Sequence, residues 1–204
     1  ATALGEEYDH MKKAGFAVNR GETKEVFDLN TAYIKQLDDA QNVNPEKLTY
    51  KDAGLSPYAD IKTGLPDVNR DKKATANTIL AAFDKEANTV DKKQYNLFTD
   101  YAGRQIGIER NNLANHLKGK YVTPAEERDK IYNNVPGILS EPSEVYFRQY
   151  NKNVYQYRFI KHYGDTMMVV EAELSKGQNL EVKTWYKAKT EDVRNGILIN
   201  KALK

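Results

Sequence analysis

The side chains in this sequence that could perform chemistry are concentrated in its second half, at His116, Arg158, His162, Thr184 and Tyr186. A histidine transfers protons near neutral pH, and an arginine binds phosphate and stabilises negative charge that develops on phosphorus. A threonine hydroxyl donates to a phosphate oxygen, and a tyrosine ring stacks on a nucleobase. Metal-free cleavage of RNA needs this combination, because the 2′-hydroxyl of the RNA is itself the nucleophile.

Other chemistries are excluded by composition. The chain has no cysteine, which rules out disulfides, cysteine-based zinc sites and a thiol nucleophile. Its histidines, His10, His116 and His162, show no helical metal-ligand spacing. We therefore expect neither a metal site nor an organic cofactor.

The overall composition is that of a globular protein, with 40% hydrophobic and 29% charged residues in 204. That length suits one ordinary domain or a small domain with a helical extension. No apolar run approaches the roughly 18 residues that span a bilayer, so we expect no membrane partner. The sequence begins at Ala1 without a signal-peptide pattern, and we expect a processed product or a fragment.

The net charge of +2 is unevenly distributed along the chain. Residues 1–103 contain 14 Lys/Arg and 17 Asp/Glu, whereas residues 104–204 contain 17 and 12, which gives the second half a net charge of +5. Nine of the fourteen tyrosines also lie between Tyr101 and Lys204. Basic residues attract phosphate and aromatic rings stack on bases, so this half is compatible with RNA binding. The alternative is a solvated basic face over a tyrosine-rich core.

The first half of the sequence has the apolar spacing of helices. We expect helices at residues 6–17, 22–39, 72–87, 91–101 and 106–117. The "TPAE" sequence at residues 123–126 is a capping-box pattern that predicts a helix reaching about Tyr132. Pro136, Gly137 and Pro142 are expected to end helical structure.

After Pro142 the apolar period changes to two, which predicts strands at residues 144–149, 154–162, 167–174 and 180–187, and a fifth at 196–200. Short connections make neighbouring strands antiparallel. We therefore expect an α+β protein: a helical N-terminal region (residues 1–100), then a small domain (residues 101–204) with helices packed on a twisted antiparallel sheet of four to five strands.

Alternation assigns the candidate residues to faces of these strands. Arg158 and His162 have the same parity and Lys161 has the other. In the last hairpin strand, Val182, Thr184 and Tyr186 share one face, and we expect Arg158 and His162 to lie on the same face. Lys183, Trp185 and Lys187 are expected on the opposite face, where the tryptophan would pack rather than bind a substrate.

Residues 116–199 resemble the nuclease-like domains of phage and polymorphic-toxin proteins in the barnase–EndoU–colicin–RelE (BECR) group. The resemblance rests on "NNLANHLKGKY", "IYNNVPGILSEPSEVYF", "YQYRFIKHYGDTMMVVEAEL" and "LEVKTWYKAK", in that order. It covers under half of the chain, and "VPGILSEPSEV" followed by the strand rich in tyrosine and basic residues is its most specific part.

This resemblance implies metal-independent RNA cleavage, often of tRNA, on the open face of the sheet. It assigns the general base to His116, the strand cation to Arg158, or else to Lys161 or His162, and the hydroxyl to Thr184, with Tyr186 two residues on. A two-histidine acid–base pair would have to recruit His162. The lysines expected to contact phosphate are Lys118, Lys120, Lys161 and Lys183.

The resemblance further implies a toxin or phage effector, virion-associated or delivered into the cytoplasm of a target bacterium. A toxin would have a neutralising immunity protein with an acidic surface. Two alternatives stay open: a non-catalytic nucleic-acid-binding or virion-associated module, and a protein-interaction module with tyrosine-rich strands as its interface. His116 has its own alternative, because a cation near a helix C-terminus is favoured by the helix dipole.

Overall fold

The computed structural model describes residues 48–151, 154–175 and 180–202, and the helices expected at residues 6–17 and 22–39 lie outside these ranges. The described residues form an eight-stranded sheet in the order β1-β2-β3-β7-β6-β5-β4-β8. Its strands are β1 (Asn88–Val90), β2 (Lys93–Thr99), β3 (Gln105–Glu109), β4 (Glu144–Asn151), β5 (Val154–His162), β6 (Met167–Ser175), β7 (Leu180–Lys187) and β8 (Ile197–Lys201). The α+β class is confirmed, with more strands than the four to five expected. The sheet is also not wholly antiparallel as expected, because β3 and β7 pair in parallel.

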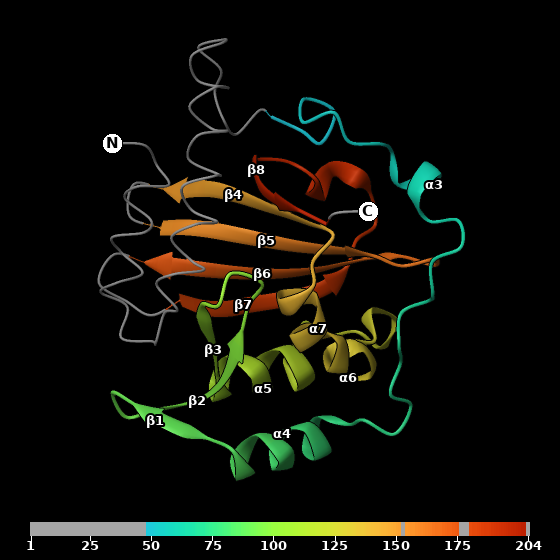
Figure 1. Cartoon of the computed structure of the whole chain (residues 1–204). Helices are drawn as coiled ribbons and strands as arrows, with labels where there is room; N and C mark the ends of the chain where they lie inside the picture. The colour runs from blue at the N-terminus through green and yellow to red at the C-terminus, as the bar shows by residue number, and fades with distance from the viewer. Residues whose placement is uncertain (1–47, 152–153, 176–179, 203–204) are drawn as a thin grey trace.

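Helices cover one face of this sheet (Figure 1). They are α4 (Ala76–Lys85), α5 (Arg110–Lys118), α6 (Arg128–Ile131) and α7 (Val135–Ser140), and the short helix α3 (Tyr58–Ile61) lies apart from them. Single 3-10 turns occur at η2 (Pro124–Glu126), η3 (Tyr132–Asn134) and η4 (Glu191–Val193). None of the described helices is long and apolar enough to cross a membrane.

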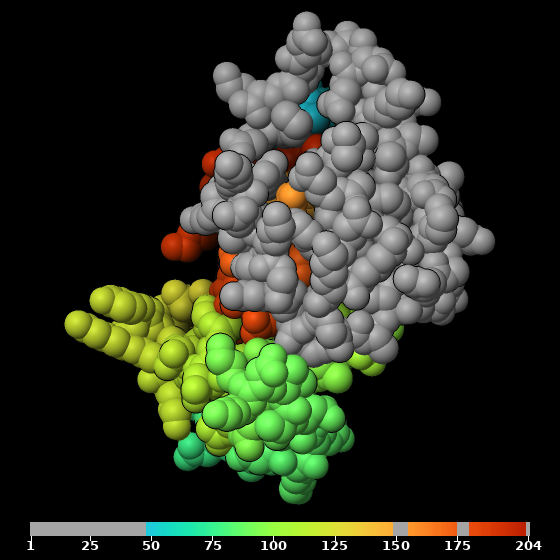
Figure 2. Space-filling model, turned by 90° about the vertical axis from the view of Figure 1, so that its left-hand side faces the viewer, coloured from blue at the N-terminus to red at the C-terminus, as the bar shows by residue number. Residues whose placement is uncertain are grey.

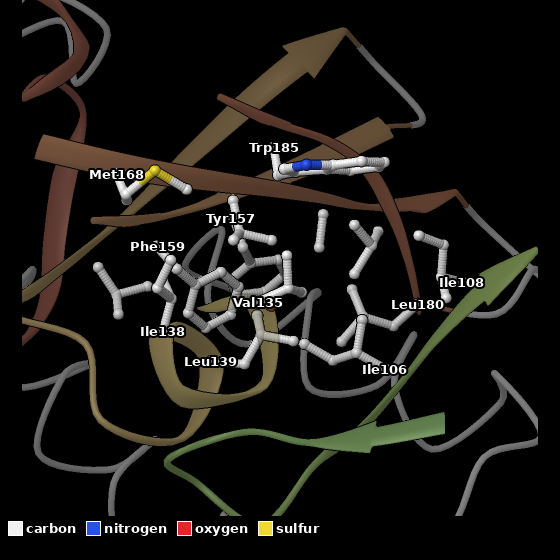
Figure 3. Packing of buried hydrophobic residues seen from close by; sticks show 14 of the residues in the cluster. Ile106, Ile108, Val135, Ile138, Leu139, Tyr157, Phe159, Met168, Leu180 and Trp185 are labelled. Atoms are coloured by element: carbon white, nitrogen blue, oxygen red, sulfur yellow. The ribbon is translucent and has the colours of Figure 1, made fainter. Parts of the chain in front are cut away.

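The five strands expected after Pro142 are confirmed, and their alternation places one set of side chains under the helices. Tyr157, Phe159 and Trp185 are fully buried there and pack with Val135 and Leu139 of α7, as Figure 3 shows. The opposite face has a smaller cluster that includes Tyr146, Ile160 and Val169 and is partly covered by residues 50–58. The sheet therefore has a helix-covered face and a second face with its own apolar patch and polar residues.

Of the helices expected in the first half, the one at residues 91–101 is wrong, and the one at residues 106–117 is confirmed only from Arg110 onwards. Residues 91–101 contain β2, and residues 106–117 contain β3 followed by α5. Short apolar runs fit a helix and a strand about equally well, and here pairing in the sheet decides between them. Ile106 and Ile108 are fully buried in β3, while Leu113 and Leu117 hold α5 against the core. The helix expected at residues 72–87 is confirmed as α4, with a capping box between Thr75 and Thr78.

The helix expected from residue 123 is also wrong in detail. Thr123 makes no side-chain cap, and the chain forms the η2 turn before Glu127 takes a left-handed conformation (φ 52°) and α6 begins. Nor does Pro136 end helical structure, because it occupies the first turn of α7. Proline is tolerated at that position, since its missing N–H would have no partner within the helix.

A β-bulge in β7 changes the faces expected from alternation. Glu171 of β6 is paired with Thr184, but the next residue, Ala172, is paired with Val182. Val182 and Trp185 consequently both join the helix-covered core, whereas the expectation put them on opposite faces. Lys183 was expected on the same face as Trp185, but it lies on the opposite face. Its Nζ atom is there 3.9 Å from Oε2 of Glu181.

Residues 62–75 form a strap that runs along the ends of β5 and β6 towards α4 (Figure 1). Gly164 N–H donates to Pro66 O at 2.9 Å, and Val68 N–H donates to Asp165 at 3.0 Å. Gly164 is required here, because a Cβ atom would lie 2.6 Å from Leu65 O. The domain boundary expected after residue 100 falls between β2 and β3, which pair along the whole of β3.

Candidate active site

Arg158, Glu171 and Thr184 form a row across three neighbouring strands. Arg158 of β5 is directly opposite Glu171 of β6, which is directly opposite Thr184 of β7. The Nε atom of Arg158 donates to Glu171 at 3.1 Å. Arg158 also donates to Val193 O at 3.0 Å and to Asn195 Oδ1 at 2.8 Å, and the residue is buried. The structure thus brings Arg158 and Thr184 onto one face, with Glu171 between them.

Tyr186 joins this row through the same carboxylate. Its hydroxyl donates to Glu171 Oε1 at 2.6 Å. Burial raises the pKa of Tyr186 well above its usual value, and the neighbouring Glu171 raises it further. The phenol therefore stays protonated at neutral pH and acts as a hydrogen-bond donor.

One edge of β7 is covered by side chains instead of a strand. The only residue pair between β3 and β7 among the described residues is Gly107–Glu181. Beyond it, Asn112 of α5 donates to Val182 O at 3.1 Å and to Lys183 O at 3.2 Å. Arg128 donates to Trp185 O. This satisfies the edge carbonyls without closing the edge with another strand.

Arg128 is the functional candidate that the sequence reading missed. Its Nη1 atom donates to Thr184 Oγ1 at 2.7 Å, and its Nε atom is 3.2 Å from Glu126. Its guanidinium lies 5.9 Å from the centre of the Trp185 ring, whose Nε1 donates to Arg128 O at 2.9 Å. No signal in the sequence pointed to it, because the helix expected from residue 123 gave Arg128 no particular position relative to β7.

His116 lies in the helical layer, on α5. Its ring centre is 5.6 Å from that of Trp185, and Nδ1 is 2.8 Å from Asn112 O. A carbonyl oxygen only accepts, so Nδ1 carries the hydrogen and Nε2 is the nitrogen that can take a proton in the neutral ring. His116 and Arg128 therefore pack on the same indole, although His116 is not in the row of Thr184.

A cleft of about 810 Å³ opens beside β7 and η2. Its charged lining consists of Arg70, Arg128, Lys187 and Lys189, against Glu126 and Asp165. The hydroxyl groups in the lining come from Thr123, Thr166, Thr190 and Tyr186. Four cations against two carboxylates, together with several hydroxyl donors, favour an anionic ligand such as a phosphodiester.

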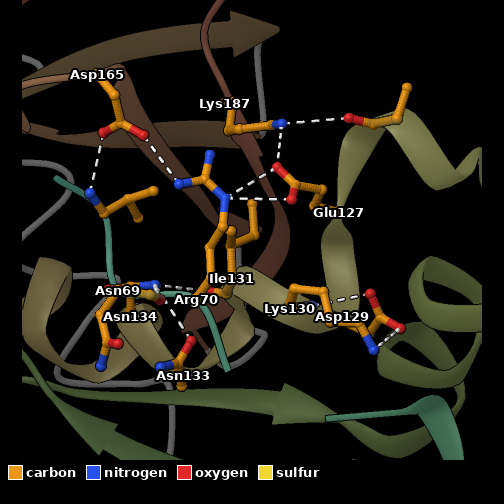
Figure 4. Close-up of polar contacts among 12 residues, drawn as sticks. Asn69, Arg70, Glu127, Asp129, Lys130, Ile131, Asn133, Asn134, Asp165 and Lys187 are labelled. Atoms are coloured by element: carbon orange, nitrogen blue, oxygen red, sulfur yellow. Dashed lines mark hydrogen bonds and ion pairs between the residues drawn. The ribbon is translucent and has the colours of Figure 1, made fainter. Parts of the chain in front are cut away.

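The rim of this cleft is a chain of half-exposed ion pairs, drawn in Figure 4. Glu127 accepts from Lys187 at 2.6 Å and from Arg70 at 3.1 Å, and Arg70 donates to Asp165 at 2.9 Å. The hydrogen bond from Lys187 lowers the pKa of Glu127, against the opposing effect of its partial burial. The cations on the rim are held in place while they remain open to solvent.

His162 is not brought to the cleft. It is buried at the C-terminal end of β5 and does not line the cleft, because its Nε2 contacts Glu144 and its ring stacks on Tyr58 at 5.8 Å. Its strand partner Met167 is four residues along β6 from Glu171, or roughly 13 Å at strand spacing. Arg194 completes this buried network with bonds of 2.9 and 2.8 Å to the two oxygens of Glu144.

The four lysines expected to contact phosphate do not share one surface. Lys118 and Lys120 are exposed at and just after the end of α5. Lys161 donates to Glu141 O at 2.9 Å, and Lys183 is half-exposed near Glu181. Among the described residues, no group of three or more His, Cys, Asp or Glu side chains is placed to hold a metal ion.

A family model described as phage-Barnase-EndoU-ColicinE5/D-RelE like nuclease2 matches residues 81–201, which is more than half of the chain. Neither the curated proteins nor the solved structures gave a significant match.

Proposed function

Because this chain belongs to the family of phage-Barnase-EndoU-ColicinE5/D-RelE like nucleases, we propose that it is an endoribonuclease that cleaves RNA in the cleft beside β7 without a metal ion. The observation that carries this proposal is the contact of Arg128 with Thr184 at 2.7 Å next to a cleft with more cations than carboxylates. This contact joins a phosphate-binding cation to the hydroxyl of the last hairpin strand.

In the proposed reaction, the 2′-oxygen of the RNA bonds to the adjacent phosphorus while the bond from phosphorus to the 5′-oxygen breaks. One proton leaves the 2′-hydroxyl and another is delivered to the 5′-oxygen. The products are a 2′,3′-cyclic phosphate and a 5′-hydroxyl. The protein must accept and donate these protons and stabilise the charge on the phosphorane oxygens.

We assign charge stabilisation to Arg128 and Lys187, which both line the cleft. Thr184 Oγ1 accepts from Arg128, so its own hydrogen is free to point to a phosphate oxygen. His116 is the proposed base, because its Nδ1 contact leaves Nε2 to take the proton. Tyr186, whose hydroxyl hydrogen is donated to Glu171, stacks on a base or accepts a hydrogen bond from it.

Arg158 and His162 receive positioning roles in this proposal. Arg158 is buried and holds Glu171, which in turn holds the Tyr186 hydroxyl. His162 belongs to the buried network around Glu144 and has no access to the cleft. Neither residue is proposed to touch the RNA.

The test is cleavage of end-labelled structured RNA by the purified chain in excess EDTA, with analysis of the product ends. We expect Arg128→Ala to cleave at least ~100-fold more slowly, because a missing charge donor costs that much in comparable sites. Arg110→Ala is the matched control, since Arg110 forms an exposed pair with Asp84 at 2.7 Å. Thermal unfolding of each variant separates lost folding from lost chemistry.

Two further variants sharpen the assignment. Thr184→Val removes the hydroxyl at nearly constant shape and should lose most activity, whereas Thr184→Ser should keep it. His116→Ala should lose activity if Nε2 is the base. Intact RNA with the wild-type protein would overturn the proposed reaction, and RNA that is bound but never cut would support the non-catalytic binding module.

A further inference from the structure

The chain leaves α5 through a tight turn at residues 119–122. A Cβ atom on Gly119 would lie 2.1 Å from Asn115 O, so only glycine allows this exit from the helix. Val122 N–H then donates to Gly119 O at 3.1 Å, which closes a β-turn. Lys120 and Tyr121 are the two central residues of that turn and are therefore presented at its tip.

Tyr121 is unusually exposed for its size. Its exposed fraction is 84%, and it is the one large hydrophobic residue classed as exposed in the part of the chain that the structure describes. Lys120 Nζ lies 5.6 Å from the centre of its ring, and Lys118 is exposed one turn earlier. Figure 2 shows this yellow-green part of the chain projecting from the body of the molecule.

The turn adjoins the proposed active site. Thr123 lines the cleft and also lines a neighbouring hollow of about 540 Å³, to which Lys118 and Arg128 both contribute. Tyr121 is two residues before Thr123, so at most about 7 Å of chain separates their Cα atoms. An RNA strand whose phosphate contacts Arg128 would have its neighbouring nucleotides within reach of this tip.

We propose that the turn at residues 119–122 is a subsite for an unpaired nucleobase, which stacks on Tyr121 while Lys118 and Lys120 bind the flanking phosphates. The ligand class is single-stranded RNA or an unpaired loop, because bases inside a duplex have no free face to offer a protruding ring. This subsite rests on the proposed function for its biological substrate, but its binding chemistry is independent of cleavage.

The test uses the full chain and a short fluorescent RNA whose 2′-oxygens are methylated, so that it binds without being cut. Anisotropy compares this single strand with a duplex of the same sequence. We expect Tyr121→Ala to bind the single strand about tenfold more weakly and the duplex with unchanged affinity. Tyr121→Phe should bind like wild type, as should Lys85→Ala, which removes an exposed cation on α4.

A fluorescent adenine analogue in the single strand gives a second readout, because stacking on Tyr121 should quench it and Tyr121→Ala should restore its emission. Wild-type affinity in Tyr121→Ala, or an equal loss on duplex and single strand, would overturn the subsite. If Tyr121-dependent binding occurs but wild type cleaves no RNA, the proposed reaction fails and the subsite stands. If RNA is cleaved but Tyr121→Ala binds normally, the reverse holds.

Discussion

Two clusters of charge lie at opposite sides of the central strands, and they differ in their exposure to water. In the first, Arg194 and Glu144 have side chains that are 0% and 5% exposed and meet at 2.8 Å, with His162 against the same carboxylate. In the second, on the cleft rim, Lys187 and Glu127 are 24% and 30% exposed. Similar bond lengths therefore occur in very different surroundings.

The difference separates charges that are needed for the fold from charges that are open to a ligand. Removing one partner of a buried pair leaves an uncompensated charge away from water, so such a pair is needed to keep the fold. A half-exposed pair contributes little to stability, and its cation can exchange a carboxylate for a phosphate at small cost. This contrast is why we place RNA at the rim and give His162 a positioning role.

The largest effect is expected where the buried network is broken. Arg194→Met should lower the free energy of unfolding by about 3–5 kcal/mol, because Glu144 would lose its charge partner. For a chain of this size, that is a fall in Tm of at least about 6 °C. Calorimetry measures it, and Arg110→Met, which opens an exposed pair, should change stability by less than about 1 kcal/mol. If the two variants lowered the unfolding free energy equally, the buried pair would not differ from the exposed pair in its contribution to stability.

The pH dependence of stability should come next in size. Burial alone would raise the pKa of Glu144, but hydrogen bonds from His162 and Arg194 outweigh it and lower the pKa from 4.5 to about 2. The ionised carboxylate therefore stabilises the fold above about pH 4.5, and this stabilisation is lost as the pH falls towards 2. It amounts to about 3 kcal/mol.

Urea denaturation of wild type and Glu144→Gln at several pH values measures this term. The difference in unfolding free energy between wild type and Glu144→Gln should be constant from pH 7 to about 5. It should become smaller below pH 4.5. A gap that stays constant down to pH 2 would mean that Glu144 is not the group responsible.

A substitution on the cleft rim should change the affinity for RNA and leave the stability of the fold almost unchanged. Lys187→Ala should weaken RNA binding by roughly tenfold at low salt and reduce the slope of log affinity against log salt by about 1, because one phosphate contact is lost. Its unfolding free energy should change by less than about 1 kcal/mol. Titrations of uncleavable RNA at several salt concentrations measure the slope, and unchanged binding would take Lys187 out of the site.

The smallest effect is expected for Asp165→Asn. This change releases Arg70 from its pair at 2.9 Å and removes a negative charge from the cleft, so RNA should bind about two- to threefold more tightly at low salt. The amide oxygen of asparagine can still accept from Val68 N–H, so stability should fall by less than about 1 kcal/mol. Weaker RNA binding would show that Arg70 is oriented by Asp165 instead of neutralised by it.

The sequence predicts β4 to β8 well because alternation with period two leaves little choice of face or partner. It fails at β2 and β3, since runs as short as Ile106 and Ile108 do not separate helix from strand without knowledge of the neighbouring strand. It also fails within β7, because alternation contains no sign of the bulge that puts Val182 and Trp185 on the same face.

The candidate residues show the same limit. Parity predicted that Arg158 and Thr184 share a face, and strand pairing places both opposite Glu171. The alternation of side chains gives the face of a residue but not its position along the strand. It therefore could not show that His162 lies away from Arg158 and Thr184. Arg128 reaches Thr184 from a different element, 56 residues away in the sequence, and only the packing of α6 on the edge of β7 creates that contact.

The strap and the residues before it have a consequence for where this domain can be separated from the rest of the chain. The family match begins at residue 81, yet Arg70 on the cleft rim and Ser56, whose carbonyl accepts from Arg194 at 2.8 Å, both precede it. A recombination breakpoint at residue 81 would transfer β5, β6 and β7 with Arg158, Glu171 and Thr184. It would leave behind Arg70 of the cleft rim and the Ser56 carbonyl that accepts from Arg194. The segment from residue 48 onwards is thus expected to be inherited together with the nuclease, not exchanged as a neutral leader.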